Sequence, residues 1–190
     1  MNCQNFFALA ALLFLTAGCS HHPDQQAGPS PADLDRAAHR LAQTSIIVDT
    51  HIDVPYRVNQ SPTDVSVATE DGDFDYPRAF TGGLNAPFMS IYTAAKLEAN
   101  GGSRDAAESL IDMVESWVAA SPDKFAIARS VADVRRQFER GLMSLPMGLE
   151  NGSPIEGDLD SLRYFYERGI RYITPAHSLS NHISDSSYDV

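Results

Sequence analysis

The most constraining feature of this sequence is the pair His51 and Asp53, which follows the apolar run 46–48 almost directly. Successive side chains of a β-strand point to opposite faces, so a strand that continues through this pair places Asp49, His51 and Asp53 on one face. An imidazole and a carboxylate two residues apart on a rigid strand can bind a divalent metal ion from one side. The sequence therefore predicts a strand here, with His51 and Asp53 as metal ligands.

Two later apolar runs end in side chains of the same kind. Residues 145–149 lead into Glu150, and residues 170–176 lead into His177. A carboxylate beside hydrophobic strand residues is costly unless it is paired or coordinating, and its two oxygens suit it to bridge two cations. We expect His177 to bind metal or to polarise a substrate, with a hydrogen-bonded loop histidine as the alternative. His182, in the polar loop that follows, is a weaker candidate for supporting the site.

Strand-like and helix-like segments alternate along the chain, which indicates parallel strands joined by crossover helices. Strands are expected at 46–49, 84–92, 142–149 and 170–174, and helices are expected to begin near residues 31, 103, 130 and 158. The metal-capable residues follow the strands, as active-site residues do in a (β/α)8 barrel. Four strands cannot close such a barrel. We therefore expect residues 32–190 to form about the N-terminal half of an α/β barrel.

Composition narrows the class of protein. The chain has 190 residues, of which 43% are hydrophobic and 21% charged, which is typical of a globular domain with a sizeable core. Its formal net charge is −11. Nucleic acids and anionic membrane surfaces favour proteins rich in Lys and Arg, so neither is an expected partner.

The N-terminus resembles that of a bacterial lipoprotein. Residues 6–17 form an apolar run of signal-peptide length, and small residues then lead to Cys19. We expect a signal peptide at 1–18, lipid attachment at Cys19 and a polar, Pro-rich tether over 19–31. Thr16 stands where the usual leucine of the lipid-attachment motif is expected, and no Lys or Arg precedes the apolar run. A plain secretory signal is the alternative.

Lipid attachment is also consistent with the small number of cysteines in the chain. Cys3 and Cys19 are the only two, so removal of the signal peptide and acylation of Cys19 leave no free thiol and no disulfide. The expected location is the periplasmic face of a bacterial membrane, with the outer membrane favoured over the inner one.

Three separated blocks resemble the membrane (renal-type) dipeptidases, peptidase family M19. They are Val-Asp-Thr-His-Ile-Asp-Val-Pro at 48–55, Met-Gly-Leu-Glu-Asn-Gly-Ser-Pro at 147–154, and the stretch 162–178 that contains His177. The blocks occur in the family's order, and the resemblance covers roughly residues 34–190. Asn151 stands where many relatives have glycine.

This resemblance implies a (β/α)8 hydrolase that uses two zinc ions to cleave dipeptides with a metal-activated water. By motif, His51 and Asp53 would hold the first zinc, Glu150 would bridge both, and His177 would contact substrate. Glu150 and His177 are thus the expected catalytic residues. The family's other two histidine ligands and its carboxylate-binding arginine lie beyond these blocks. The chain alone is therefore expected to carry an incomplete second zinc site.

Two other classes remain open. A related amidohydrolase-type enzyme that cleaves a cyclic amide or a lactone would share the first motif, although the block around Glu150 argues against it. A non-catalytic lipoprotein could keep half of the fold for binding, and its zinc content would distinguish it. Dipeptides and, through the lipid, a membrane are the expected partners, with a homodimer as a further alternative.

Overall fold

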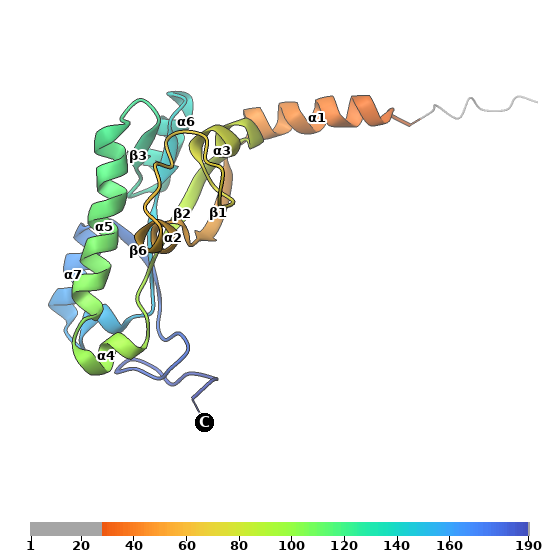
Figure 1. Ribbon diagram of the computed structural model, residues 1–190. Helices are drawn as coiled ribbons and strands as arrows, with labels where there is room; N and C mark the ends of the chain where they lie inside the picture. Colours follow the sequence, from red (N-terminus) through yellow and green to blue (C-terminus); the bar gives the residue numbers. More distant parts are fainter. Residues whose placement is uncertain (1–27, 190) are drawn as a thin grey trace, which may run out of the picture.

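The computed structural model describes residues 28–189 (Figure 1). The predicted signal peptide 1–18, the lipidation site Cys19 and most of the tether 19–31 lie outside these residues. In chain order the elements are α1 (Pro31–Thr44), β1 (Ile47–Ile52), α2 (Val54–Gln60), α3 (Tyr76–Gly82), β2 (Leu84–Tyr92), α4 (Lys96–Asn100), α5 (Ser103–Ala120), β3 (Phe125–Ile127), α6 (Val131–Glu139), β4 (Met143–Leu145), β5 (Met147–Glu150), the 3-10 helix η1 (Ser153–Ile155), α7 (Leu159–Glu167) and β6 (Ile170–Thr174).

Helices begin where the sequence supplies a cap. Ser30 caps α1 in a reciprocal pair with Asp33, and Pro31 occupies the first turn. Ser130 caps α6 by accepting a hydrogen bond from the backbone N–H of Asp133 (3.1 Å). Such caps satisfy backbone N–H groups that have no partner inside the helix, so these helix starts were predictable.

The main sheet has four parallel strands in the order β1-β2-β5-β6. Every connection between sequential strands of this sheet contains a helix, as is usual for the crossovers that parallel pairing requires. This confirms the predicted α/β class with parallel strands. Figure 1 shows α5 and α7 running along one side of the sheet, with β1 at the sheet edge away from them.

The strand predicted over 142–149 is divided at Pro146. Its first part, β4, pairs with β3, whereas its second part, β5, pairs with β2. Proline has no N–H to donate to a ladder and tends to interrupt one, while its carbonyl here accepts from the backbone N–H of Met89 (2.8 Å). The short run 125–127 thus forms a second, two-stranded sheet with β4 rather than a strand of the main sheet.

Alternation along the strands separates a buried face from a polar one. Met89, Ile91, Met147 and Leu149 are fully buried in one cluster with residues of α5. Ser90, Glu150 and Tyr172 lie on the other face, where Ser90 bonds Glu150 and the ring of Tyr172 covers Gly148. The polar face carries the candidate site.

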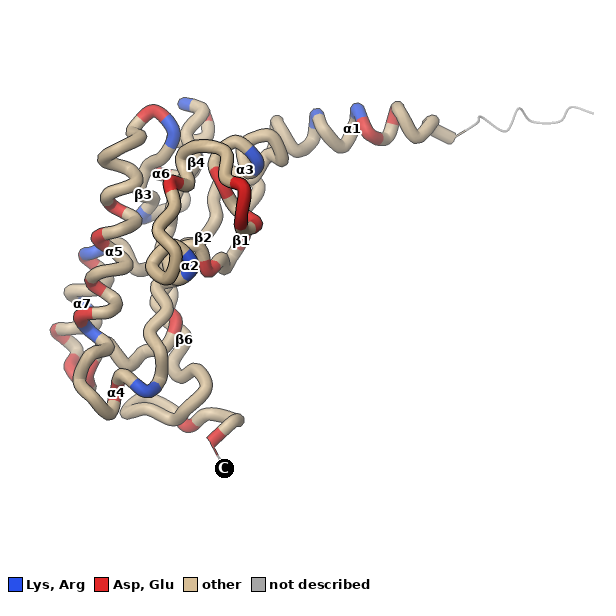
Figure 2. Tube along the Cα trace, viewed as in Figure 1, with Lys and Arg blue, Asp and Glu red and all other residues tan. Residues whose placement is uncertain are grey.

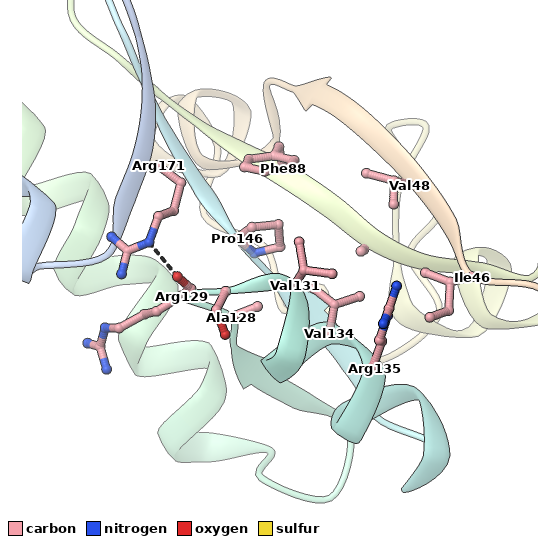
Figure 3. A pocket seen from close by; sticks show the side chains of 12 residues that line it. Ile46, Val48, Phe88, Ala128, Arg129, Val131, Val134, Arg135, Pro146 and Arg171 are labelled. Carbon is pink, nitrogen blue, oxygen red and sulfur yellow. Dashed lines mark hydrogen bonds between the residues drawn. The ribbon is translucent and has the colours of Figure 1, made fainter.

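An apolar cavity of about 530 Å³ opens at the amino ends of the strands (Figure 3). Its lining includes Ile46, Val48, Phe88, Val131, Val134 and Pro146. Val48 is 47% exposed, so the start of β1 contributes an uncovered apolar surface. The cavity lies at the opposite end of the strands from His51 and Glu150.

Helix α1 extends away from the rest of the molecule (Figure 1). Its apolar side chains are not buried, since Leu34 is 55% and Leu41 66% exposed. Near its end, the Gln43 side chain donates hydrogen bonds to the carbonyl groups of Phe80 and Thr81 (3.4 and 3.0 Å). None of the helices between residues 28 and 189 combines the length and apolar character needed to cross a bilayer.

Candidate metal centre

Strand β1 extends beyond the predicted range 46–49 but does not reach Asp53. It stops at Ile52, and Asp53 is the residue that precedes α2. The register against β2 also shifts, because the step from Asp49 to Ile52 matches the shorter step from Pro87 to Met89. An extra residue in one strand re-aims the side chains that follow it.

The predicted shared face of Asp49, His51 and Asp53 is therefore only partly correct. Asp49 turns its carboxylate to the backbone, where it accepts a hydrogen bond from the N–H of His51 (3.0 Å). His51 and Asp53 do come together, with Nε2 of His51 at 3.4 Å from Oδ1 of Asp53. The irregularity at the end of β1, rather than simple alternation, brings these two side chains together.

Glu150, the last residue of β5, completes a group of three. Its Oε2 atom lies 3.2 Å from Nε2 of His51. Among the described residues, His51, Asp53 and Glu150 form a group whose potential ligand atoms all lie within 4.8 Å of one another. The sequence prediction that these residues meet agrees with this geometry.

The Glu150 carboxylate is held between two histidines. Its second oxygen, Oε1, lies 3.2 Å from Nε2 of His177, and Oε2 also accepts a hydrogen bond from the Ser90 hydroxyl (2.7 Å). The Glu150 side chain is only 14% exposed, whereas those of His51 and His177 are 36% and 38% exposed. A mostly buried carboxylate therefore presents one oxygen to each imidazole, beside a surface that solvent reaches.

His177 lies beyond the end of β6 and packs against Tyr92. The two ring centroids are 5.1 Å apart at an interplanar angle of 66°. Burial, the neighbouring Tyr56 and the carboxylates of Glu150 and Asp53 raise the pKa of the Tyr92 phenol. Its hydroxyl is therefore neutral near pH 7, and its ring packs edge-on against that of His177.

Tyr172 is a residue of this group that the sequence did not single out. Its hydroxyl lies 2.7 Å from Nδ1 of His51. Burial, followed by the charges of Glu150, Asp53 and Asp49, raises the pKa of Tyr172 to about 12. Strand alternation gave no signal for it, because β6 shifts its register against β5 between Ile170 and Ile173.

His182 does not support the group of three directly. Its Nδ1 atom lies 2.9 Å from Oε1 of Glu98, and its backbone N–H donates to the same oxygen (3.0 Å). Glu98 also accepts a hydrogen bond from the Ser153 hydroxyl (2.6 Å). His182 therefore pairs with Glu98 rather than with a residue of the group of three, which does not favour this weaker candidate.

Asn151 follows Glu150 with a left-handed backbone, at φ 76°. Glycine adopts this conformation readily and asparagine is among the few other residues that do, which accounts for asparagine at a position where glycine is common. The buried Asn151 side chain donates to the carbonyl of Thr93 (3.0 Å) and accepts from Asn181 (2.9 Å). It thus joins the ends of β2 and β5 to the loop after His177.

The group of three suits a divalent metal ion. It offers one imidazole nitrogen and two carboxylates, which are among the ligands that Zn²⁺ uses in proteins. The second imidazole nitrogen of His51 already has a partner, as is usual for a histidine that binds metal. Figure 2 shows further acidic segments at and beside β1, which add negative charge near the group.

Comparison with known proteins identifies the family. The model of the membrane dipeptidase family, peptidase family M19, matches residues 35–190. The chain belongs to this family. The sequence blocks around His51, Glu150 and His177 therefore lie inside a region that matches this family as a whole.

Named relatives agree with this assignment. Dipeptidase aclJ of Aspergillus oryzae is 33% identical over 123 residues, which cover 60% of this chain and 29% of that protein. The probable dipeptidase PvdM of Pseudomonas aeruginosa has the same fold, with a TM-score of 0.76 at 23% identity over 85% of this chain and 42% of that one. A metallopeptidase from Rhodobacter sphaeroides, solved with a phosphinate mimic of the dipeptide L-Ala-D-Ala, matches with a TM-score of 0.61 at 25% identity over 70% of this chain and 46% of that one.

The chain spans less than half the length of the curated relatives it matches. It covers 29% of the A. oryzae dipeptidase and 41% of dipeptidase ataJ of Aspergillus terreus, to which it is 28% identical over 172 residues and 82% of its own length.

Proposed function

We propose that this chain carries the first metal site of a zinc-dependent dipeptidase. The observation that carries the proposal is the Glu150 carboxylate, which faces His51 with one oxygen and His177 with the other, with Asp53 alongside. Family membership and the dipeptidase names of the relatives support the reaction class. The substrate class is a small dipeptide.

His51, Asp53 and Glu150 would hold the zinc ion. Their donor atoms fit it, and three protein ligands leave a position open, as catalytic zinc sites do. When bound, Zn²⁺ lowers the pKa of a water molecule and polarises a carbonyl group. Glu150, with two oxygens directed to different sides, is suited to bridge a second ion in the complete enzyme.

The protein's own groups would orient and bind the substrate. His177 presents Nε2 next to Glu150 on a partly exposed surface, so it can donate a hydrogen bond to the oxygen of a peptide carbonyl. Stabilising the charge that develops on this oxygen is the larger part of catalysis in many acyl-transfer enzymes. Ser90 would hold the orientation of Glu150 through its 2.7 Å hydrogen bond.

We propose that these residues belong to the first half of a (β/α)8 barrel. The relatives' greater length and the uncovered apolar cavity at the amino ends of the strands support this. Hydrolysis would then need the remaining strands and the ligands of the second zinc ion. A homodimer in which two halves complete each other is the alternative source of those strands, and the mass of the protein in solution tests it.

We further propose that the chain is exported and anchored by a lipid on Cys19 at the periplasmic face of a bacterial membrane. The apolar run 6–17 and the small residues before Cys19 support this proposal. Residues 1–18 would be removed as a signal peptide.

Zinc content and dipeptide hydrolysis, measured together, test the proposed function. The chain alone should bind up to one zinc ion and release little or no amino acid from a panel of dipeptides. The chain joined to the remaining strands of its barrel should bind two and hydrolyse dipeptides. Hydrolysis of a lactone or a cyclic amide instead would favour another amidohydrolase-type enzyme, and a folded protein without zinc affinity would favour a binding lipoprotein.

A further inference from the structure

The two ring nitrogens of His51 have different partners. Nε2 faces the carboxylates of Glu150 and Asp53 at 3.2 and 3.4 Å, whereas Nδ1 lies 2.7 Å from the Tyr172 hydroxyl. A histidine that binds metal through one nitrogen carries its proton on the other, and the partner of that other nitrogen fixes both the tautomer and the ring orientation. Tyr172 occupies this partner position.

Tyr172 reaches His51 by crossing β5 at Gly148. A Cβ atom on Gly148 would lie 2.0 Å from Cζ of the Tyr172 ring, far inside van der Waals contact. Only glycine therefore fits at residue 148, because the tyrosine ring fills the space that any larger side chain would occupy. The ring of Phe88 lies against Tyr172 as well, with centroids 5.4 Å apart. The tyrosine is thus held on two sides, and its hydroxyl is directed at His51.

We propose that Tyr172 is a positioning residue for the metal site. Its phenolic oxygen accepts the Nδ1–H of His51, which leaves the Nε2 lone pair free for the metal, and Gly148 provides the space through which the ring passes. A phenol oxygen can accept as well as donate, so the contact is compatible with this direction. The inference rests on the proposed metal site and adds a residue on β6 to a group otherwise drawn from β1, β5 and the residue after β1.

The test measures Zn²⁺ affinity and the His51 tautomer in the full chain. Tyr172→Phe removes the hydroxyl but keeps the ring over Gly148 and against Phe88. It should weaken Zn²⁺ binding by about 10- to 100-fold, the range found for partners of metal-binding histidines. Tyr166→Phe is the matched control, because Tyr166 is 60% exposed on α7, and it should bind Zn²⁺ like the parent chain.

Nitrogen-15 NMR of the imidazole supplies a readout that a purely structural role would not move. In the zinc-loaded parent chain, His51 should carry its proton on Nδ1, and in Tyr172→Phe this single tautomer should be lost or mixed. Unfolding in the presence of a chelator should be nearly the same for both proteins. Gly148→Ala should also weaken Zn²⁺ binding, because its methyl group displaces the Tyr172 ring.

Each result has a definite meaning. A parent chain that binds no Zn²⁺ would overturn the metal site and this inference with it. A parent chain that binds Zn²⁺, together with Tyr172→Phe of equal affinity and an unchanged Nδ1–H tautomer, would overturn the role of Tyr172 alone. If Tyr172→Phe also unfolds more easily in chelator, the His51 tautomer in its zinc-loaded form distinguishes the two roles of Tyr172. Loss of the single Nδ1–H tautomer supports positioning, and an unchanged tautomer shows packing alone.

Discussion

The carboxylate of Glu150 lies 3.2 Å from Nε2 of His51, although the two residues come from strands that are not neighbours in the sheet. Strand β2 lies between them and contributes Ser90, which donates to the same Glu150 oxygen. The contact therefore depends on both the strand order and the register shift that turns the end of β1. It is the central relationship of the proposed metal site.

Glu150→Gln should weaken Zn²⁺ binding by at least about tenfold and abolish hydrolysis in the complete enzyme. The amide has nearly the same shape but no charge, and only one of its two terminal atoms can coordinate. Zinc titration and a dipeptide assay measure the two effects. Glu167→Gln, an exposed change at the end of α7, is the control. Near-normal turnover with full zinc content would remove Glu150 from the site.

Asn151→Ala should destabilise the fold more than Asn151→Gly. Both variants lose the hydrogen bonds to Thr93 and Asn181, and a buried polar group left without a partner costs about 1–3 kcal/mol. Alanine also pays a steric cost of about 1–2 kcal/mol at a left-handed backbone position, which glycine avoids. Urea unfolding measures the difference. An alanine variant as stable as the glycine variant would contradict the role of the backbone at φ 76°.

Asp75 should make the fold sensitive to acid. It is fully buried and accepts hydrogen bonds from the backbone N–H of Thr69 (3.0 Å) and Arg78 (2.9 Å) and from the Arg78 guanidinium (2.7 Å). Burial opposes ionisation, but these donors outweigh it and lower the pKa of Asp75 from 3.8 to about 2. Because the folded pKa lies below the unfolded one, this stabilisation is present above pH 3.8 and is lost as the pH falls towards 2.

Asp75→Asn tests this directly. It should lower the free energy of unfolding by about 1–3 kcal/mol at pH 7, and the difference from the parent chain should shrink as the pH approaches 2. Denaturant unfolding at a series of pH values measures it, with the exposed Asp35→Asn on α1 as control. A difference that stays constant with pH would show that the charge of Asp75 is not what matters.

Cys19→Ser should prevent lipid attachment, because the hydroxyl does not replace the thiol as the acylated group. Incorporation of labelled fatty acid in a bacterial host measures this, and Cys3→Ser should leave labelling intact. Label retained in Cys19→Ser would rule out the proposed attachment site.

Much of this fold was predictable from local signals. Two helix starts were predicted from the caps at Ser30 and Ser130, and β2 was predicted from its apolar run. The alternation of strand and helix predicted a parallel sheet. The break at Pro146 follows from proline chemistry, although the sequence did not tell which neighbour each half would pair with. That choice depends on contacts between distant segments. On α7 the apolar Leu159 and the aromatic Tyr166 are 77% and 60% exposed, because this helix instead buries Ser161 and Phe165.

The site was predictable in its members but not in its geometry. His51, Asp53, Glu150 and His177 were recognisable because each follows a strand-like run. The register shift in β1, the hydroxyl of Tyr172 at Nδ1 of His51 and the pairing of His182 with Glu98 were not, because each depends on how separate segments are stacked. Gly148 shows the same limit, since its importance lies in the ring above it.

The location of bound zinc tests the account most directly. Crystals of the chain grown with Zn²⁺ can be measured at the zinc absorption edge, where anomalous scattering locates the ion. We predict one strong peak in contact with Nε2 of His51 and with carboxylate oxygens of Asp53 and Glu150, while the Tyr172 hydroxyl remains at Nδ1. A strong peak at His182 and Glu98 instead, or no peak in the group of three at saturating zinc, would contradict the proposed centre.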